Sequence, residues 1–118
     1  MSSLSREKFY ALGRLKQGQM NKTEAAYAEH LELLKRGGEI LWWKFEPVKF
    51  KLADNTHYNP DFMVVNKNRE VEIHEVKGFW RDDARCKIKI AADMYPMKFI
   101  AVKLRPKNKG GGWQVEEF

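Results

Sequence analysis

The sequence contains little cysteine and no long apolar stretch, and each absence excludes a class of protein. A single cysteine, Cys86, among 118 residues cannot form a disulfide framework or a cysteine-based zinc cage. No apolar run approaches the roughly 20 residues of a membrane-spanning helix, so no membrane partner is expected. The N-terminal segment MSSLSREKFYALGR lacks the continuous apolar core of a secretion signal. These absences lead us to expect a cytoplasmic protein.

The composition that remains is that of a globular domain with basic ends. Hydrophobic residues make up 43% of the chain and charged residues 32%, which is enough apolar surface for a core. The net charge is +6, and the basic excess lies in residues 1–22 and 97–118. This charge is compatible with a polyanionic partner. We predict a basic N-terminal arm over residues 1–20 and a single domain over residues 21–118.

The hydrophobic pattern predicts two helices and a mixed sheet. A first helix is expected over residues 22–35, because Asn21 and Glu24 can form a capping box and Gly37 can end the helix. Strands are expected over residues 40–52 with a break at Pro47, over 62–65, 71–76 and 98–104, with a last edge strand over 113–118. A second helix is expected over residues 81–95. This order predicts an α/β protein whose sheet is flanked by helices.

Three charged residues are expected to meet at one end of this sheet. Asp61 opens one strand, and Glu75 and Lys77 end the next, which should be its antiparallel neighbour. Two carboxylates held close together repel each other unless a cation or a proton intervenes. Oxygen ligands of this kind suit Mg²⁺ or Mn²⁺, and the backbone carbonyl of Val76 could add a further ligand. The pattern therefore predicts a divalent metal site with Lys77 beside it.

The same residues resemble the PD-(D/E)XK, or restriction-endonuclease-like, nuclease superfamily. The matching segments are Pro60-Asp61 and Glu75-Val76-Lys77, and the resemblance covers roughly residues 21–104. The local sequence around these segments is most similar to that of small phage-encoded members of the superfamily. It is also similar to endonuclease subunits of transposons and to phage junction-resolving nucleases. The resemblance implies an α-β-β-β-α-β core.

By this resemblance the protein would be a metal-dependent DNA endonuclease that hydrolyses phosphodiester bonds. Asp61, Glu75 and Lys77 would form the catalytic centre, and Glu24 on the first helix would assist as a further metal ligand. Mg²⁺ (or Mn²⁺) would be the cofactor, with no small-molecule cofactor. A chain this short has little room for a sequence-reading domain, so branched or junction DNA is the expected substrate. Resolving a Holliday junction needs two cuts, which suggests a homodimer in the host cytoplasm if the protein is phage-encoded.

Several residues have a second interpretation that the sequence leaves open. Glu24 could simply complete the capping box. His74 points away from Glu75 along the strand and is expected to be structural. The second helix, which follows the site, carries cations that could contact DNA phosphates: Arg81, Arg85, Lys87 and Lys89. The alternative for these cations is a solvated helix face. Tyr58, just before the site, is expected to be an aromatic DNA contact.

Two other functions remain possible for the same sequence. One is a catalytically weak module with the nuclease fold that binds DNA or a protein partner. The other is a nuclease of this fold that acts on RNA. Cleavage assays on DNA and RNA substrates would separate both from the DNA endonuclease interpretation.

Overall fold

The computed structural model describes residues 18–78 and 82–118, which form two helices, seven strands and one 3₁₀ turn. The predicted basic arm lies mostly in residues 1–17, which are outside the described residues. Within the described part of the chain, no helix has the length and apolarity needed to cross a bilayer. The elements are α2 (Lys22–Arg36), β1 (Ile40–Phe45), β2 (Phe50–Ala53), β3 (Thr56–Tyr58), β4 (Phe62–Asn66), β5 (Val71–Val76), α3 (Asp82–Met94), β6 (Lys98–Leu104), the 3₁₀ turn Lys107–Lys109 and β7 (Trp113–Glu117).

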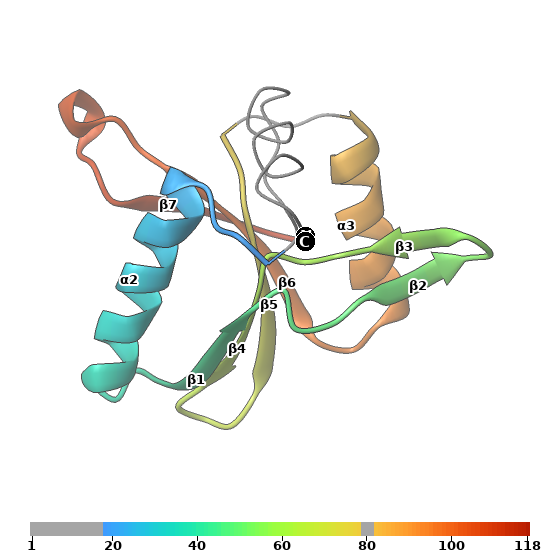
Figure 1. The fold of residues 1–118 in the computed structure, drawn as a ribbon, viewed down its shortest axis with the longest axis horizontal. Coiled ribbons are helices and arrows are strands. Elements are labelled where there is room, and N and C mark those ends of the chain that lie inside the picture. Colours follow the sequence, from blue (N-terminus) through green and yellow to red (C-terminus); the bar gives the residue numbers. More distant parts are fainter. Residues whose placement is uncertain (1–17, 79–81) are drawn as a thin grey trace, which may run out of the picture.

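The main sheet is mixed and has five strands in the order β1-β4-β5-β6-β7 (Figure 1). β1, β4 and β5 are antiparallel neighbours, β6 lies parallel to β5, and β7 returns antiparallel to β6. The parallel pair requires a crossover connection, which α3 supplies. The predicted mixed α/β class and the pairing of the two strands that carry the candidate site are confirmed.

A second, two-stranded sheet formed by β2 and β3 differs from the sequence prediction. Residues 40–52 were expected to form one interrupted strand, but its two halves belong to different sheets. Pro47 lies between β1 and β2, where it cannot donate a ladder hydrogen bond. Asn55 at the tip of the β2–β3 hairpin has φ 57°, a conformation that Asn tolerates better than most residues.

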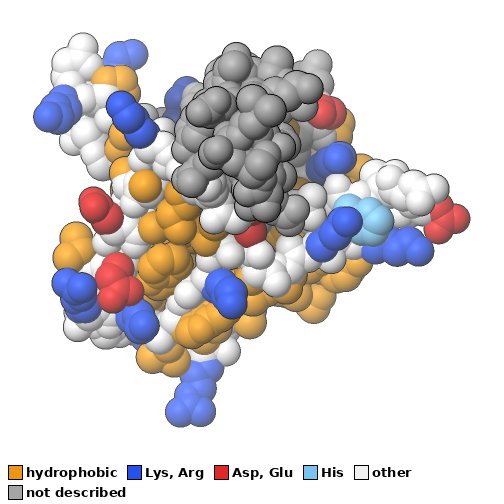
Figure 2. All heavy atoms as spheres, in the orientation of Figure 1, with side chains coloured by type: hydrophobic (Ala, Val, Ile, Leu, Met, Phe, Trp, Pro, Cys, Tyr) orange, Lys and Arg blue, Asp and Glu red, His pale blue; other side chains and the backbone are white. Residues whose placement is uncertain are grey.

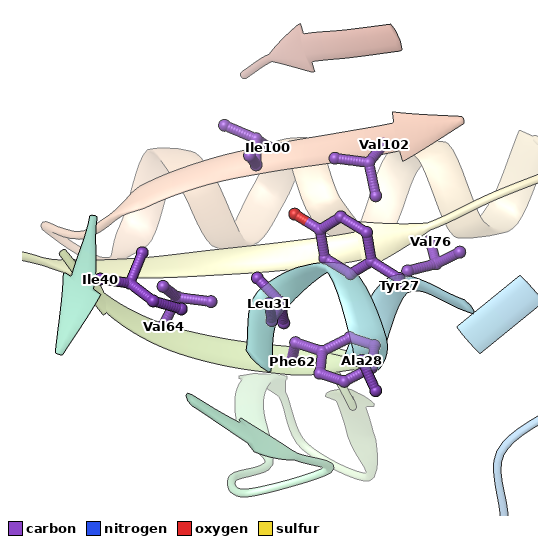
Figure 3. Close-up of a cluster of buried hydrophobic side chains, with 9 residues drawn as sticks. All are labelled: Tyr27, Ala28, Leu31, Ile40, Phe62, Val64, Val76, Ile100 and Val102. Carbon is purple, nitrogen blue, oxygen red and sulfur yellow. The ribbon is translucent and has the colours of Figure 1, made fainter. Parts of the chain in front are cut away.

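Each face of the main sheet is covered by one helix (Figure 1). α2 packs on the face that carries Phe62 and Val64, which together with Leu31 are fully buried (Figure 3). α3 and the β2–β3 hairpin pack on the opposite face through a cluster that includes Ile73 and Phe99. Because side chains alternate along a strand, neighbouring residues of β4 and β5 enter different clusters. This alternation decides which side of the sheet each site residue occupies.

The capping box predicted for the first helix is present. The Asn21 side chain accepts a hydrogen bond from the backbone N–H of Glu24 at 2.8 Å, and the Glu24 carboxylate accepts one from the backbone N–H of Asn21 at 2.9 Å. These two bonds satisfy backbone donors that a helix start leaves without partners. They also fix the position of Glu24 in the first turn of α2.

Candidate active site

The β4–β5 pairing brings Asp61 and Glu75 to the same edge of the sheet. Phe62 is paired with His74, so Asp61 lies just before β4 at the level of Glu75 in the antiparallel strand β5. The backbone N–H of Val76 donates a hydrogen bond to Asp61 Oδ2 at 2.8 Å. The Asp61 side chain therefore contacts β5 directly at the position where the backbone ladder stops. We call this edge, defined by Asp61, Glu75 and Lys77, the acidic rim.

Glu75 is the most enclosed charged residue of the acidic rim, with 5% of its surface exposed. The hydroxyl of Tyr58 donates a hydrogen bond to Glu75 Oε1 at 2.7 Å. The ammonium of Lys77 lies 3.0 Å from Glu75 Oε2. A buried carboxylate is costly unless it has such partners, because burial removes its hydration. Both oxygens of Glu75 are thus held in defined directions.

The two carboxylates influence each other electrostatically. Burial, followed by the nearby charge of Glu75, raises the pKa of Asp61 to about 8. Burial also raises the pKa of Glu75, although Lys77 and the Tyr58 hydroxyl favour its charged form. Two carboxylates in this situation retain a proton near neutral pH unless a cation neutralises them. Cation binding at the acidic rim is therefore coupled to the release of this proton.

The donor set fits Mg²⁺ or Mn²⁺. Over residues 18–78 and 82–118, no three His, Cys, Asp or Glu side chains converge on one point that could hold an ion. Mg²⁺ commonly uses one or two carboxylates and keeps several waters, so a pair of carboxylates is enough to hold it. Asp61 and Glu75 supply that pair. The contribution of the Val76 carbonyl remains a prediction.

Glu24 approaches the acidic rim from the other side of the sheet. Its helix, α2, packs on the face opposite Glu75, and its Oε1 atom accepts the Asn21 backbone N–H of the capping box. Its negative charge nevertheless contributes to the raised pKa of Asp61. The structure thus supports the capping role directly and places the carboxylate within electrostatic reach of the site. Its role as a metal ligand remains a prediction.

The cations predicted to contact DNA lie in different environments. Arg81 lies outside the described residues. The guanidinium of Arg85 forms an ion pair with Glu116 of β7, with Nη1 3.1 Å from Oε1, and lies over the ring of Phe118. Lys87 lines a hollow of about 210 Å³ that also includes His57 and Glu75, whereas Lys89 is exposed. Lys87 thus shares a hollow with Glu75 of the acidic rim, whereas Arg85 is held by Glu116 of β7.

The prediction for Tyr58 requires correction. It was expected to contact DNA, but only 5% of its surface is exposed, and its ring packs near Phe50 and Phe99. Burial raises the pKa of Tyr58, so its hydroxyl stays protonated and acts as the donor to Glu75. Tyr58 is therefore a positioning residue. Sequence reasoning missed this role because β3 has only three residues, too few to show a strand period.

His74 has the structural role expected for it. Its Nδ1 atom lies 2.6 Å from the Tyr27 hydroxyl, and its Nε2 atom lies 2.9 Å from Glu72 Oε1. The pair with Tyr27 places the ring on the α2 side of the sheet, away from Glu75. His74 thus joins α2 to β5 through a buried hydrogen-bond network.

Tyr58→Phe is expected to weaken divalent-cation binding about tenfold, because Glu75 Oε1 loses the donor that orients it. The variant keeps the aromatic packing and removes only the hydroxyl. Isothermal titration calorimetry with Mn²⁺ measures the effect. Tyr95→Phe is a matched control, since the Tyr95 hydroxyl donates to the backbone carbonyl of Lys51 instead. Equal Mn²⁺ affinity in Tyr58→Phe and wild type would contradict the positioning role.

Fold and site together define a class: an α/β protein with two carboxylates and a lysine at one edge of a mixed sheet. The family model described as "Protein of unknown function (DUF1064)" matches residues 18–110, and the chain belongs to this family. The match includes Glu24 and the whole acidic rim. No curated protein and no solved structure matches the chain.

Proposed function

We propose that this protein is a Mg²⁺- or Mn²⁺-dependent DNA endonuclease with a restriction-endonuclease-like core of the PD-(D/E)XK type. The observation that carries the proposal is the meeting of Asp61, Glu75 and Lys77 at the acidic rim. The chain order α2, β1, β4, β5, α3 and β6 supports the α-β-β-β-α-β arrangement. The β2–β3 hairpin is an insertion into this order, and it supplies Tyr58 to the site.

Each residue of the acidic rim has a distinct role in this proposal. Asp61 and Glu75 hold the cation, and Tyr58 and the Val76 N–H orient their carboxylates. The cation, when bound, supplies Lewis-acid activation of water and neutralises phosphate charge. Lys77 places an ammonium beside Glu75, where it stabilises the negative charge that develops on the phosphate. In the reaction a water oxygen bonds to phosphorus and one bridging P–O bond breaks, leaving one phosphate end and one hydroxyl end.

The substrate class that we propose rests on how the described elements are used. The described residues form one main sheet, its two helices, the small β2–β3 hairpin and the β6–β7 connection, and most of these elements are used for the core and the acidic rim. We therefore propose that the enzyme recognises DNA structure, such as a branch or four-way junction, and works as a homodimer. Two copies would provide the two cuts that junction resolution needs.

Incubation of the purified protein with supercoiled plasmid and with a synthetic four-way junction tests this function. We expect nicking or cleavage with Mg²⁺ or Mn²⁺ and none with EDTA. The same assay with an RNA duplex of the same sequence tests the choice of nucleic acid. Binding without cleavage under all metal conditions would overturn the enzymatic proposal and favour a binding module, and preferential cleavage of RNA would overturn the choice of DNA.

A further inference from the structure

The β6–β7 connection is a basic hairpin that extends from the acidic rim. β6 is parallel to β5, so its C-terminal end lies at the same edge of the sheet as Glu75 and Lys77. The last sheet pair is Leu104 with Trp113, and the chain between them forms a separate projection beside the N-terminal end of α2 (Figure 1). We call residues 103–113 the basic hairpin.

The charge of the basic hairpin is all of one sign. Its four charged residues are exposed cations, and the segment contains no Asp or Glu; they are Lys103, Arg105, Lys107 and Lys109. Within residues 18–78 and 82–118 none of these four forms an ion pair. Figure 2 shows Lys and Arg side chains on this projection. A solvated cluster of like charges repels itself, so it gains from an anionic partner.

The basic hairpin has a defined local structure. Gly112 accepts a hydrogen bond from the backbone N–H of Arg105 at 2.9 Å, and the Pro106 carbonyl accepts bonds from the N–H groups of Lys109 and Gly111. Gly110 has φ 100°, which an L side chain rarely adopts, so glycine is needed for the turn. At the base, the Trp113 ring contacts the Tyr27 ring of α2, with centroids 4.9 Å apart. The cations therefore lie on a hairpin that is folded and is attached to the core.

The basic hairpin and the acidic rim lie close enough together to contact one polyanion. Lys103 and Lys77 line the same hollow of about 200 Å³. From the last sheet pair, the four residues on each side of the tip reach at most about 13 Å outward. Duplex DNA rises about 3.4 Å per base pair, so this reach corresponds to about four base pairs from the site.

We propose that the basic hairpin contacts the phosphate backbone of duplex DNA flanking the scissile phosphate at the acidic rim. This inference rests on the proposed function for its choice of DNA as the polyanion. It assigns the basic hairpin a positioning role, because contacts with phosphates fix the position of the protein along the duplex without reading the base sequence.

The test compares two variants that lose the same charge at opposite ends of the sheet. The hairpin variant carries Arg105→Gln, Lys107→Gln and Lys109→Gln. The control carries Lys35→Gln, Lys67→Gln and Lys98→Gln, which lie at the last turn of α2, the β4–β5 turn and the start of β6. Fluorescence anisotropy with a duplex of about 20 base pairs gives the affinity at several salt concentrations, in EDTA so that no metal-dependent cleavage occurs.

We expect the hairpin variant to bind at least tenfold more weakly at 0.15 M salt, with a log–log salt slope that is shallower by about 2 to 3. The control should keep the wild-type slope. An unchanged hairpin variant, or an equal loss in the control, would overturn the proposal. So would binding of polyglutamate as tight as that of DNA. A wild type that binds through the hairpin but cleaves nothing would overturn the nuclease function alone.

Discussion

Asp61→Asn is expected to stabilise the metal-free protein by about 1–2 kcal/mol at pH 8, because it removes a largely buried charge that lies beside a second carboxylate. Asp61 is held in a largely buried position beside Glu75, and both conditions disfavour its charge. Asparagine has nearly the same shape, and its carbonyl oxygen can still accept the Val76 N–H bond. The substitution therefore removes the repulsion and keeps the local geometry.

The sign of the pH dependence follows from the raised pKa. A free aspartate releases its proton near pH 3.9, whereas Asp61 in the folded protein keeps it up to about pH 8. Between these values, unfolding releases a proton, so the free energy of unfolding falls as the pH rises. The contribution of protonated Asp61 to the free energy of unfolding is fully present below about pH 4 and is lost as the pH rises through about 8. Asp61→Asn should flatten this slope.

Thermal unfolding in EDTA at pH 5, 6, 7 and 8 measures both effects. For a domain of this size, each kcal/mol corresponds to about 5 °C in the melting temperature. Asp54→Asn serves as the control, because Asp54 is exposed on the β2–β3 hairpin and forms an ion pair with Lys51. A wild type equally stable at pH 5 and pH 8, with no gain in Asp61→Asn, would contradict the electrostatic account of the acidic rim.

Glu75→Gln is expected to lower metal-dependent DNA cleavage at least a hundredfold. The substitution keeps the size of the side chain but removes the charge that pairs with Lys77 and would bind the cation. Lys77→Met should cause a comparable loss, because it removes the ammonium that stabilises phosphate charge. Plasmid nicking rates at saturating Mg²⁺ and Mn²⁺ measure both variants.

DNA binding provides the distinction between a catalytic loss and a folding loss. In EDTA, Glu75→Gln should bind duplex DNA as tightly as wild type, because the proposed backbone contacts lie on the basic hairpin. Glu70→Gln is the matched control for cleavage, since Glu70 is exposed in the β4–β5 turn at the other end of these strands. Cleavage by Glu75→Gln at half the wild-type rate or more would remove Glu75 from the proposed mechanism.

The parts of the fold that the sequence predicted are those governed by local signals. The start of α2 depends on Asn21 and Glu24, which act within one helical turn. Strands β5 and β6 have the predicted bounds, residues 71–76 and 98–104. The juxtaposition of Asp61 and Glu75 was also predictable, because a short turn joins two strands whose register places them at one edge.

The parts that were missed depend on contacts between distant residues. Tyr58 reaches Glu75 only because the β2–β3 hairpin folds back over the sheet, and a three-residue strand has no recognisable period. Arg85 pairs with Glu116, 31 residues away, after β7 has joined the sheet. Neither partner is marked by a local motif, so the tertiary structure was needed to assign both residues.

Titration of metal-free protein with Mn²⁺, followed by electron paramagnetic resonance, tests the central claim most directly. The claim is that Asp61 and Glu75 together hold one divalent cation. It predicts saturable binding of one Mn²⁺ per chain in wild type and loss of that site in both Asp61→Asn and Glu75→Gln. Undiminished Mn²⁺ binding in these two variants, or no saturable binding in wild type, would contradict it.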